Sequence, residues 1–123
     1  MVAPTAGGLF EWEQTGDTLV LLPRKDLGES DYEQITDSAK EVLELLSNGQ
    51  VKNLVMDFSR TDYYGSTALG FFLKLWKRVK SRSGKMAFCN VSEHEMEVLI
   101  LTHLNTLWPV CKTRQDALAT VKS

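Results

Sequence analysis

The order of secondary structure is clearest in residues 53–70, which read NLVMDFSRTDYYGSTALG. The first part, residues 53–58, is a short apolar run of the kind that parallel sheets bury. After it, apolar side chains recur at helical spacing, at Leu69, Phe72, Trp76 and Val79. The pattern predicts a buried strand, a short loop and a helix over residues 66–82, so that Ser66 and Thr67 lie at the start of that helix.

This position gives the Ser66 hydroxyl two interpretations. The first backbone N–H groups of a helix lack internal acceptors and carry partial positive charge, so a phosphate on Ser66 would be tolerated there. Ser66 is therefore a candidate phosphorylation site, with Thr67 as the second candidate. On spacing alone, the simpler interpretation is favoured, in which Ser66 or Thr67 only caps the helix.

The remaining elements are predicted from alternation, apolar periodicity and capping patterns. In chain order they are a β-hairpin of residues 10–14 and 19–22 with the second strand more buried, a helix opened by a capping box at Ser30 and Glu33, the strand and helix above with Gly84 ending the helix, a strand at 86–90, a helix opened by a capping box at Ser92 and Glu95, an edge strand at 107–111, and a helix at 114–122. The order β-β-α-β-α-β-α-β-α predicts an α/β fold with a central mixed sheet and about four helices.

Length and composition favour one domain. A chain of 123 residues with 43% apolar content can bury a real core, and we expect a flexible tail at 1–8 and a single domain at 9–123. Cys89 and Cys111 are too few and too far apart for a disulfide scaffold, and no apolar run reaches the roughly 20 residues of a membrane helix. We therefore expect a cytoplasmic protein without direct membrane insertion.

Charge is unevenly distributed along the chain. Residues 1–63 hold 5 basic and 12 acidic residues (net −7), whereas residues 64–123 hold 9 basic and 4 acidic residues (net +5). A basic helix face is usually just solvated, and the pI of about 5.7 is wrong for a dedicated nucleic-acid binder, so no nucleic acid is expected as a partner. Whether the two charged halves meet in a homodimer stays open.

The chemistry of the side chains does not favour an enzyme. Residues 65–70 lack the spacing of a nucleotide-binding loop or a hydrolase elbow. His94 and His103 are too far apart on a helix to share a metal, and His103 is expected on the face of the third helix. Asp57 and Asp62 could form a carboxylate pair, although strand-end and loop acids are more often solvated or turn-forming. No catalytic residue, metal ligand or cofactor is predicted.

The stretch Asp62 to Gly70, placed after the strand at 54–58, resembles the signature of STAS domains, the anti-sigma-factor antagonist family. Residues 84–92, 104–110 and 116–118 resemble the later strands, turn and helix of that family, in the same order. The resemblance implies a bacterial partner-switching protein that has no catalytic activity, binds an anti-sigma factor or serine kinase, and is dephosphorylated by a phosphatase. It implies phosphorylation at Ser66 and partner binding by Asp62, Tyr63, Tyr64, Gly65, Ser66, Thr67 and Leu69.

Two residues depart from the family pattern. Gly65 stands where the family usually has an aspartate, and Ala68 replaces the first of its later glycines. Gly65 leaves open an alternative of the same fold, a constitutive adaptor or scaffold subunit that is not phosphorylated, such as a partner of a transporter ATPase. A third alternative is a small enzyme or nucleotide-binding protein that uses Asp57, Asp62 and Ser66.

The expected mechanism of control is a change of charge at Ser66. An unmodified Ser66 hydroxyl beside apolar groups such as Tyr64 and Leu69 suits docking against a protein surface. A phosphate adds about −1.5 to −2 charges there, which opposes docking and releases the partner.

Overall fold

The computed structural model describes residues 8–47 and 49–122, and its centre is a five-stranded mixed sheet with the strand order β1-β2-β3-β4-β5. Strands β1 and β2 are antiparallel, and each following pair is parallel. The strands are β1 (Phe10–Thr15), β2 (Thr18–Pro23), β3 (Asn53–Asp57), β4 (Met86–Cys89) and β5 (Val110–Cys111). The predicted α/β class and element order are confirmed. Of the predicted tail at 1–8, all but Gly8 lies outside the described residues.

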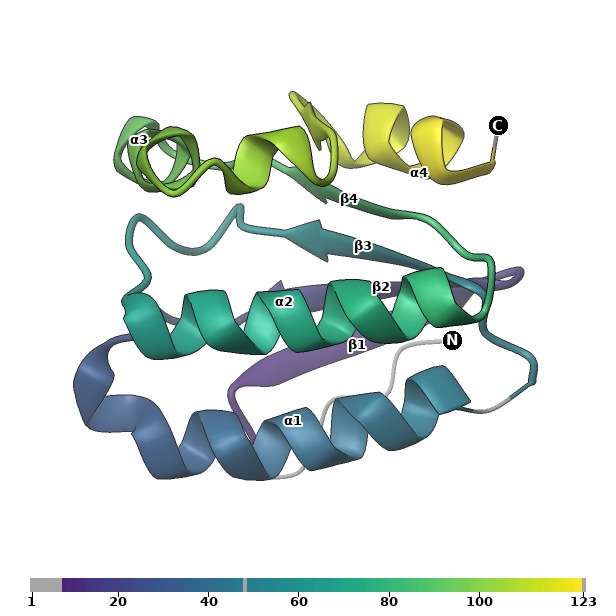
Figure 1. Ribbon diagram of the computed structural model, residues 1–123, viewed down its shortest axis with the longest axis horizontal. Coiled ribbons are helices and arrows are strands. Elements are labelled where there is room, and N and C mark those ends of the chain that lie inside the picture. Colours follow the sequence, from purple (N-terminus) through teal and green to yellow (C-terminus); the bar gives the residue numbers. More distant parts are fainter. Residues whose placement is uncertain (1–7, 48, 123) are drawn as a thin grey trace.

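Helices pack on both faces of the sheet, as Figure 1 shows. Helices α1 and α2 lie side by side over one face, and α4 packs on β3 and β4 from the other. The helices are α1 (Tyr32–Ser47), α2 (Ser66–Ser81), α3 (Glu93–Leu101) and α4 (Arg114–Lys122), with 3-10 turns η1 (Glu29–Asp31) and η2 (Leu104–Thr106). None of these helices has the length and apolar character needed to cross a membrane.

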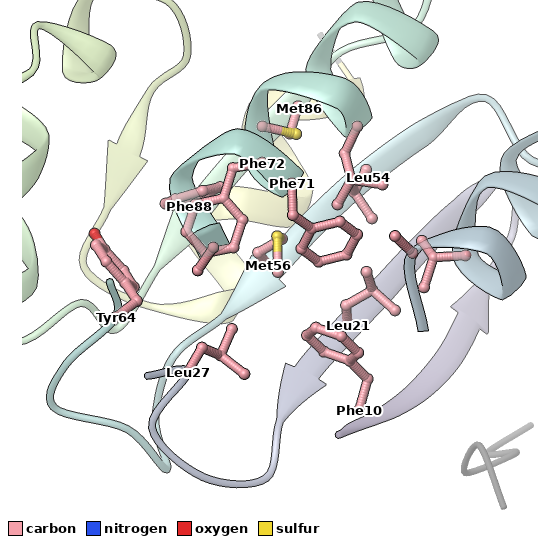
Figure 2. Packing of buried hydrophobic residues seen from close by; sticks show 14 of the residues in the cluster. Phe10, Leu21, Leu27, Leu54, Met56, Tyr64, Phe71, Phe72, Met86 and Phe88 are labelled. Atoms are coloured by element: carbon pink, nitrogen blue, oxygen red, sulfur yellow. The ribbon is translucent and has the colours of Figure 1, made fainter. Parts of the chain in front are cut away.

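The larger core lies between the sheet and the α1–α2 layer (Figure 2). Phe72 of α2 is fully buried and packs edge-on against Phe58, Tyr64 and Phe88, with ring centroids 5.1–5.6 Å apart. Aromatic pairs of this geometry stabilise beyond the area that they bury. The start of α2 is therefore fixed to the strand ends by the same rings that fill the core.

The hairpin forms as predicted. Gly16 has φ +61° in the turn between β1 and β2, a left-handed conformation that favours glycine, and Thr15 pairs with Thr18. Every residue of β2 is buried because the strand lies between β1 and β3 with packed residues on both faces. The prediction that the second strand is the more buried one is confirmed.

The capping box predicted at Ser30 and Glu33 is wrong. Ser30 lies inside the 3-10 turn η1, and α1 begins two residues later, at Tyr32. Asp31 organises this turn: its Oδ2 accepts from the Gly28 N–H at 3.0 Å, and its Oδ1 pairs with Lys25 Nζ at 2.8 Å. The capping box at Ser92 and Glu95 is confirmed at the start of α3.

Three details near the ends of elements also differ from the prediction. The edge strand β5 is limited to Val110–Cys111, because η2 and the buried Trp108 take up the residues before it. His103 is not on a helix face, since it leaves α3 with φ 61°. After α2, the residue in the left-handed conformation is Ser83 (φ 63°) and not Gly84. Gly84 instead lets its backbone lie close to the Lys52 carbonyl, with which a Cβ atom at position 84 would collide.

Parallel strands bring three loops to one end of the molecule. The connections after β2, β3 and β4 all leave the carboxyl edge of the sheet, and Figure 1 shows the first turns of α1 and α2 at that same end. In open α/β sheets this edge is where functional groups from separate loops meet. It is also where residues 62–67 lie.

Candidate functional site

Helix α2 begins at an exposed serine. Gly65 is the N-cap, with extended backbone (φ −98°, ψ −174°), and it has no side chain to cap the helix. Ser66, the first helical residue, is exposed, and Thr67 is half-buried. The predicted placement of both hydroxyls at the helix start is confirmed.

The carboxylate of Glu29, in η1, caps this helix from another loop. Its Oε1 accepts from Ser66 Oγ at 3.1 Å and from the Thr67 N–H at 3.4 Å, and its Oε2 accepts from Thr67 Oγ1 at 3.0 Å. These bonds, those from Thr67 foremost, lower the pKa of Glu29, so the side chain is ionised at neutral pH. The interpretation in which Ser66 or Thr67 caps the helix is therefore wrong, because both hydroxyls donate to the residue that does.

Gly65 and Glu29 fit each other sterically. A Cβ atom at position 65 would collide with Glu29 Oε1. A side chain at position 65 would therefore compete with the carboxylate for its present place at the first turn of α2. The departure from the family pattern at Gly65 is thus accompanied by a carboxylate that comes from a different loop.

The loop between β3 and α2 is held by backbone contacts to the connection after β2. The Leu27 N–H donates to the Tyr63 carbonyl at 3.3 Å, and the Gly65 N–H donates to the Leu27 carbonyl at 2.8 Å. One oxygen of Asp26 accepts from the N–H groups of Asp62 (2.8 Å) and Tyr63 (3.3 Å). The backbone on both sides of Gly65 is therefore fixed before any partner is bound.

Tyr64 anchors the same loop from the inside. It is 1% exposed, and its hydroxyl donates to the Glu95 carbonyl in α3 at 2.8 Å. Figure 2 shows its ring at the edge of the core with the oxygen pointing away from the other labelled rings. Tyr64 therefore does not lie on the rim beside Ser66, contrary to the sequence-based expectation, and its neighbour Tyr63, 46% exposed, is the aromatic side chain on the surface.

Glu95 is a fully buried carboxylate beneath this loop. It accepts from Thr61 Oγ1 at 2.5 Å and from the Ser92 N–H at 2.9 Å. Burial raises the pKa of Glu95, and these hydrogen bonds oppose the rise only in part. The group ties the loop after β3 to the start of α3.

Asp62 is exposed and pairs with His94 rather than with Asp57. Its Oδ2 lies 3.0 Å from His94 Nδ1, a contact that raises the pKa of the histidine. Asp57 is buried instead, bonded to Arg114 Nε at 2.9 Å and to Asn90 Nδ2 at 2.9 Å. The structure therefore engages Asp57, Asp62 and Ser66 with three separate sets of partners and does not assemble them into one constellation.

Within residues 8–47 and 49–122, no three His, Cys, Asp or Glu side chains gather as a metal site would require.

A groove of about 360 Å³ runs from Ser66 along the seam between α1 and α2. Its lining includes the apolar side chains of Ile35, Leu43 and Phe71, and the exposed Tyr32 lines it together with Ser66 and Thr67. Lys40 and Lys74 also line it. The exposed serine thus lies next to an apolar depression with basic side chains. Leu69 is half-buried on the same helix.

Sequence reasoning misses Glu29 and Asp26 altogether, and it identifies Glu95 only as a capping residue. A signal for the first two existed, since the acidic connection after β2 must lie beside the loop after β3 when those strands are parallel neighbours. Glu95 was recognised as a capping residue, but its second role under Thr61 depends on tertiary packing.

Comparisons with known proteins identify the family and the fold of the chain. The model of the STAS domain family matches residues 10–117. A protein of Bordetella bronchiseptica named as the anti-sigma factor antagonist BtrV is 28% identical over 72 residues, which are 58% of this chain and 62% of that protein. This chain therefore spans less than two thirds of that relative's length.

Solved structures show the same fold. The Thermotoga maritima protein TM1081, which is named as an anti-sigma factor antagonist, superposes with a TM-score of 0.82 at 23% identity, covering 93% of this chain and 95% of the other. The Bacillus cell fate determinant SpoIIAA in its phosphorylated form superposes with a TM-score of 0.66 at 21% identity, covering 91% and 98%.

Proposed function

The chain belongs to the STAS domain family, and we propose that it is an anti-sigma-factor antagonist whose docking to a protein partner is controlled by phosphorylation of Ser66. The partner is an anti-sigma factor with serine kinase activity, and a phosphatase restores the unmodified state. The chain itself acts as a binding module and not as an enzyme. The observation that carries the proposal is the exposed Ser66 hydroxyl at the first position of α2. The loop just before it is held in place by backbone hydrogen bonds to Leu27.

The surface around Ser66 supports docking. Tyr63, three residues before the serine, is exposed, and Ser66 itself lines the groove with Ile35 and Phe71. Aromatic and apolar side chains framed by polar groups are typical of the centre and rim of protein interfaces. We propose that Asp62, Tyr63, Ser66, Thr67 and Leu69 contact the partner, while the buried Tyr64 and Gly65 hold the surface in shape.

Phosphorylation would change the charge of this surface. Ser66 Oγ attacks the γ-phosphorus of ATP held by the kinase, the Oγ–P bond forms, the bond to the bridging oxygen breaks, ADP leaves, and a base of the kinase takes the hydroxyl proton. The new group carries about −1.5 to −2 charges. Bringing that charge into an interface built around a neutral hydroxyl is expected to lower affinity by about two to three decades.

A constitutive adaptor of the same fold is the second candidate. The observation in its favour is that the hydroxyls of Ser66 and Thr67, the two candidate phosphorylation sites, are both hydrogen-bonded to Glu29 in the unmodified protein. An adaptor would bind its partner equally well whether or not position 66 is charged. The two candidates therefore differ in one measurable quantity, the effect of Ser66→Asp on partner affinity.

The test is phosphoryl transfer followed by binding. The protein is incubated with ATP, Mg²⁺ and the anti-sigma kinases of its own genome, and its intact mass is measured. We expect a gain of one phosphate, lost in Ser66→Ala and retained in Ser81→Ala, a matched exposed serine at the other end of α2. Partner binding is then measured by calorimetry, with Ser66→Asp expected to bind at least about tenfold more weakly.

Two results would overturn the switch. A mass gain that survives Ser66→Ala would place the modification elsewhere. Unchanged partner affinity in Ser66→Asp would favour the adaptor.

A further inference from the structure

We propose that Glu29 holds, in the unmodified protein, the place at the N-terminus of α2 that a phosphate on Ser66 needs, so that modification expels this carboxylate and releases the turn that carries it. The inference rests on the proposed modification of Ser66 and adds the moving part of the switch. It assigns to Glu29 a positioning role, acting on the acceptor hydroxyl and not on the reacting phosphorus.

Glu29 accepts hydrogen bonds from three donors of the first turn. Two hydroxyls and one backbone N–H point to its two oxygens, at 3.0–3.4 Å. These are the groups that an anion at a helix N-terminus uses, and here an anion of the same chain already occupies them. A phosphate on Ser66 Oγ would compete for the same donors.

Charge makes the two occupants incompatible. The hydrogen bonds from Thr67 and Ser66 keep Glu29 ionised, so a phosphate carrying about −1.5 to −2 charges would lie within bonding distance of a carboxylate. Like charges at such separations repel even in water. Glu29 is exposed, so it can leave towards solvent without unfolding the core.

The turn that carries Glu29 can transmit this movement. Residues on either side of it are bonded separately: Leu27 pairs with the loop before α2, and Asp31 closes η1 on Gly28 and pairs with Lys25. Tyr32, which follows Asp31 and is 59% exposed, lines the groove next to Ser66. Once Glu29 is released, η1 keeps only these bonds of Leu27 and Asp31, so we expect the turn to open more often and to shift Tyr32 in the wall of the groove.

Gly65 offers a second, uncharged way to expel Glu29. A Cβ atom at residue 65 would collide with Glu29 Oε1, so Gly65→Ala should displace the carboxylate by steric contact alone. Gly70→Ala is the matched control, because a Cβ atom at this exposed position of α2 meets nothing within 4 Å.

The experiment follows Glu29 directly and needs neither kinase nor partner. Carbon NMR of the Glu29 carboxyl is recorded against pH in the wild type, Thr67→Val, Ser66→Asp, Gly65→Ala and Gly70→Ala. We expect the pKa to lie below the ordinary 4.5 in the wild type and Gly70→Ala, and to rise in the other three. In Ser66→Asp, hydrogen exchange of the Thr67 and Asp31 amides should quicken by about twofold to tenfold, the range for losing one hydrogen bond.

Repeating the Ser66→Asp measurement in a Glu29→Gln protein separates the effect of charge repulsion from that of the altered side chain. In Glu29→Gln, adding Ser66→Asp should change exchange less than it does in the wild type, because the repulsion is gone. Glu33→Gln, an exposed acid of α1, should leave the response at its wild-type size. The inference is overturned if Ser66→Asp leaves the Glu29 pKa and the exchange rates unchanged. That failure would leave the proposed function standing, since the function is judged by phosphoryl transfer and partner affinity.

Discussion

Replacing Tyr64 by phenylalanine removes the hydroxyl group that joins the loop before α2 to α3. Tyr64 is 1% exposed, and its hydroxyl donates to the Glu95 carbonyl at 2.8 Å, joining the loop before α2 to α3. A buried hydrogen bond of this kind contributes about 0.5–1.5 kcal/mol net, so we expect Tyr64→Phe to lower the free energy of unfolding by about 1 kcal/mol. For a chain of this size the melting temperature should fall by roughly 3–6 °C.

The neighbouring tyrosine provides the control. Tyr63 is 46% exposed, and loss of its hydroxyl in Tyr63→Phe should change stability by less than about 0.5 kcal/mol. Urea unfolding followed by circular dichroism measures both variants, and unchanged m-values confirm that the unfolded states are comparable. Equal stability of the two variants would refute the assignment of Tyr64 as the internal anchor and Tyr63 as the surface residue.

Three further predictions concern the same framework. Burial raises the pKa of Glu95, so the stability that this group contributes is complete below the ordinary pKa of 4.5 and is lost as pH rises through the folded-state pKa. Glu95→Gln should not show this loss, so between pH 4 and pH 8 its free energy of unfolding in urea should rise relative to the wild type by about 1.4 kcal/mol per unit of pKa difference. Parallel pH profiles of the two proteins would contradict this prediction. Burial opposes ionisation of Asp57, but hydrogen bonds from Asn90 and Arg114 outweigh it and lower the pKa, so its contribution is present above 3.8 and is lost as pH falls through the folded-state value. Arg114→Met should therefore destabilise the protein by roughly 2–3 kcal/mol at pH 7, less than the ~3–5 of a fully buried pair, and a denaturation midpoint equal to that of the wild type would count against this network. Gly84→Ala would bring a Cβ atom against the Lys52 carbonyl and should cost about 1–3 kcal/mol in a thermal melt, whereas Gly70→Ala should be neutral or stabilising; the reverse order would refute the close approach at Gly84.

The succession of elements could be predicted because each one is encoded locally. Alternation and the turn at Gly16 determine the hairpin, and the spacing of Ser92 and Glu95 determines the start of α3. The pattern at Ser30 and Glu33 has the same spacing and fails, because Asp31 bonds Gly28 and draws Ser30 into a 3-10 turn. Local patterns thus identify a helix more securely than they identify its first residue.

The site was predicted only where it depends on its own segment. The placement of Ser66 follows from the strand and helix around it, whereas Glu29 lies 37 residues away in sequence and meets Ser66 through tertiary structure. The pair Tyr63 and Tyr64 shows a similar limit. Nothing in two adjacent tyrosines tells which one enters the core, and the choice is made by the backbone pairing of residues 63–65 with Leu27.

The central claim is that charge on Ser66 controls docking, and one measurement tests it directly. The protein is phosphorylated by its kinase, the position of the phosphate is read in the tryptic peptide 61–74, where fragment ions separate Ser66 from Thr67, and the affinity of the kinase for the modified and unmodified forms is compared by calorimetry. We predict phosphate on Ser66 and an affinity lower by about two to three decades. Equal affinities of the two forms would contradict the account.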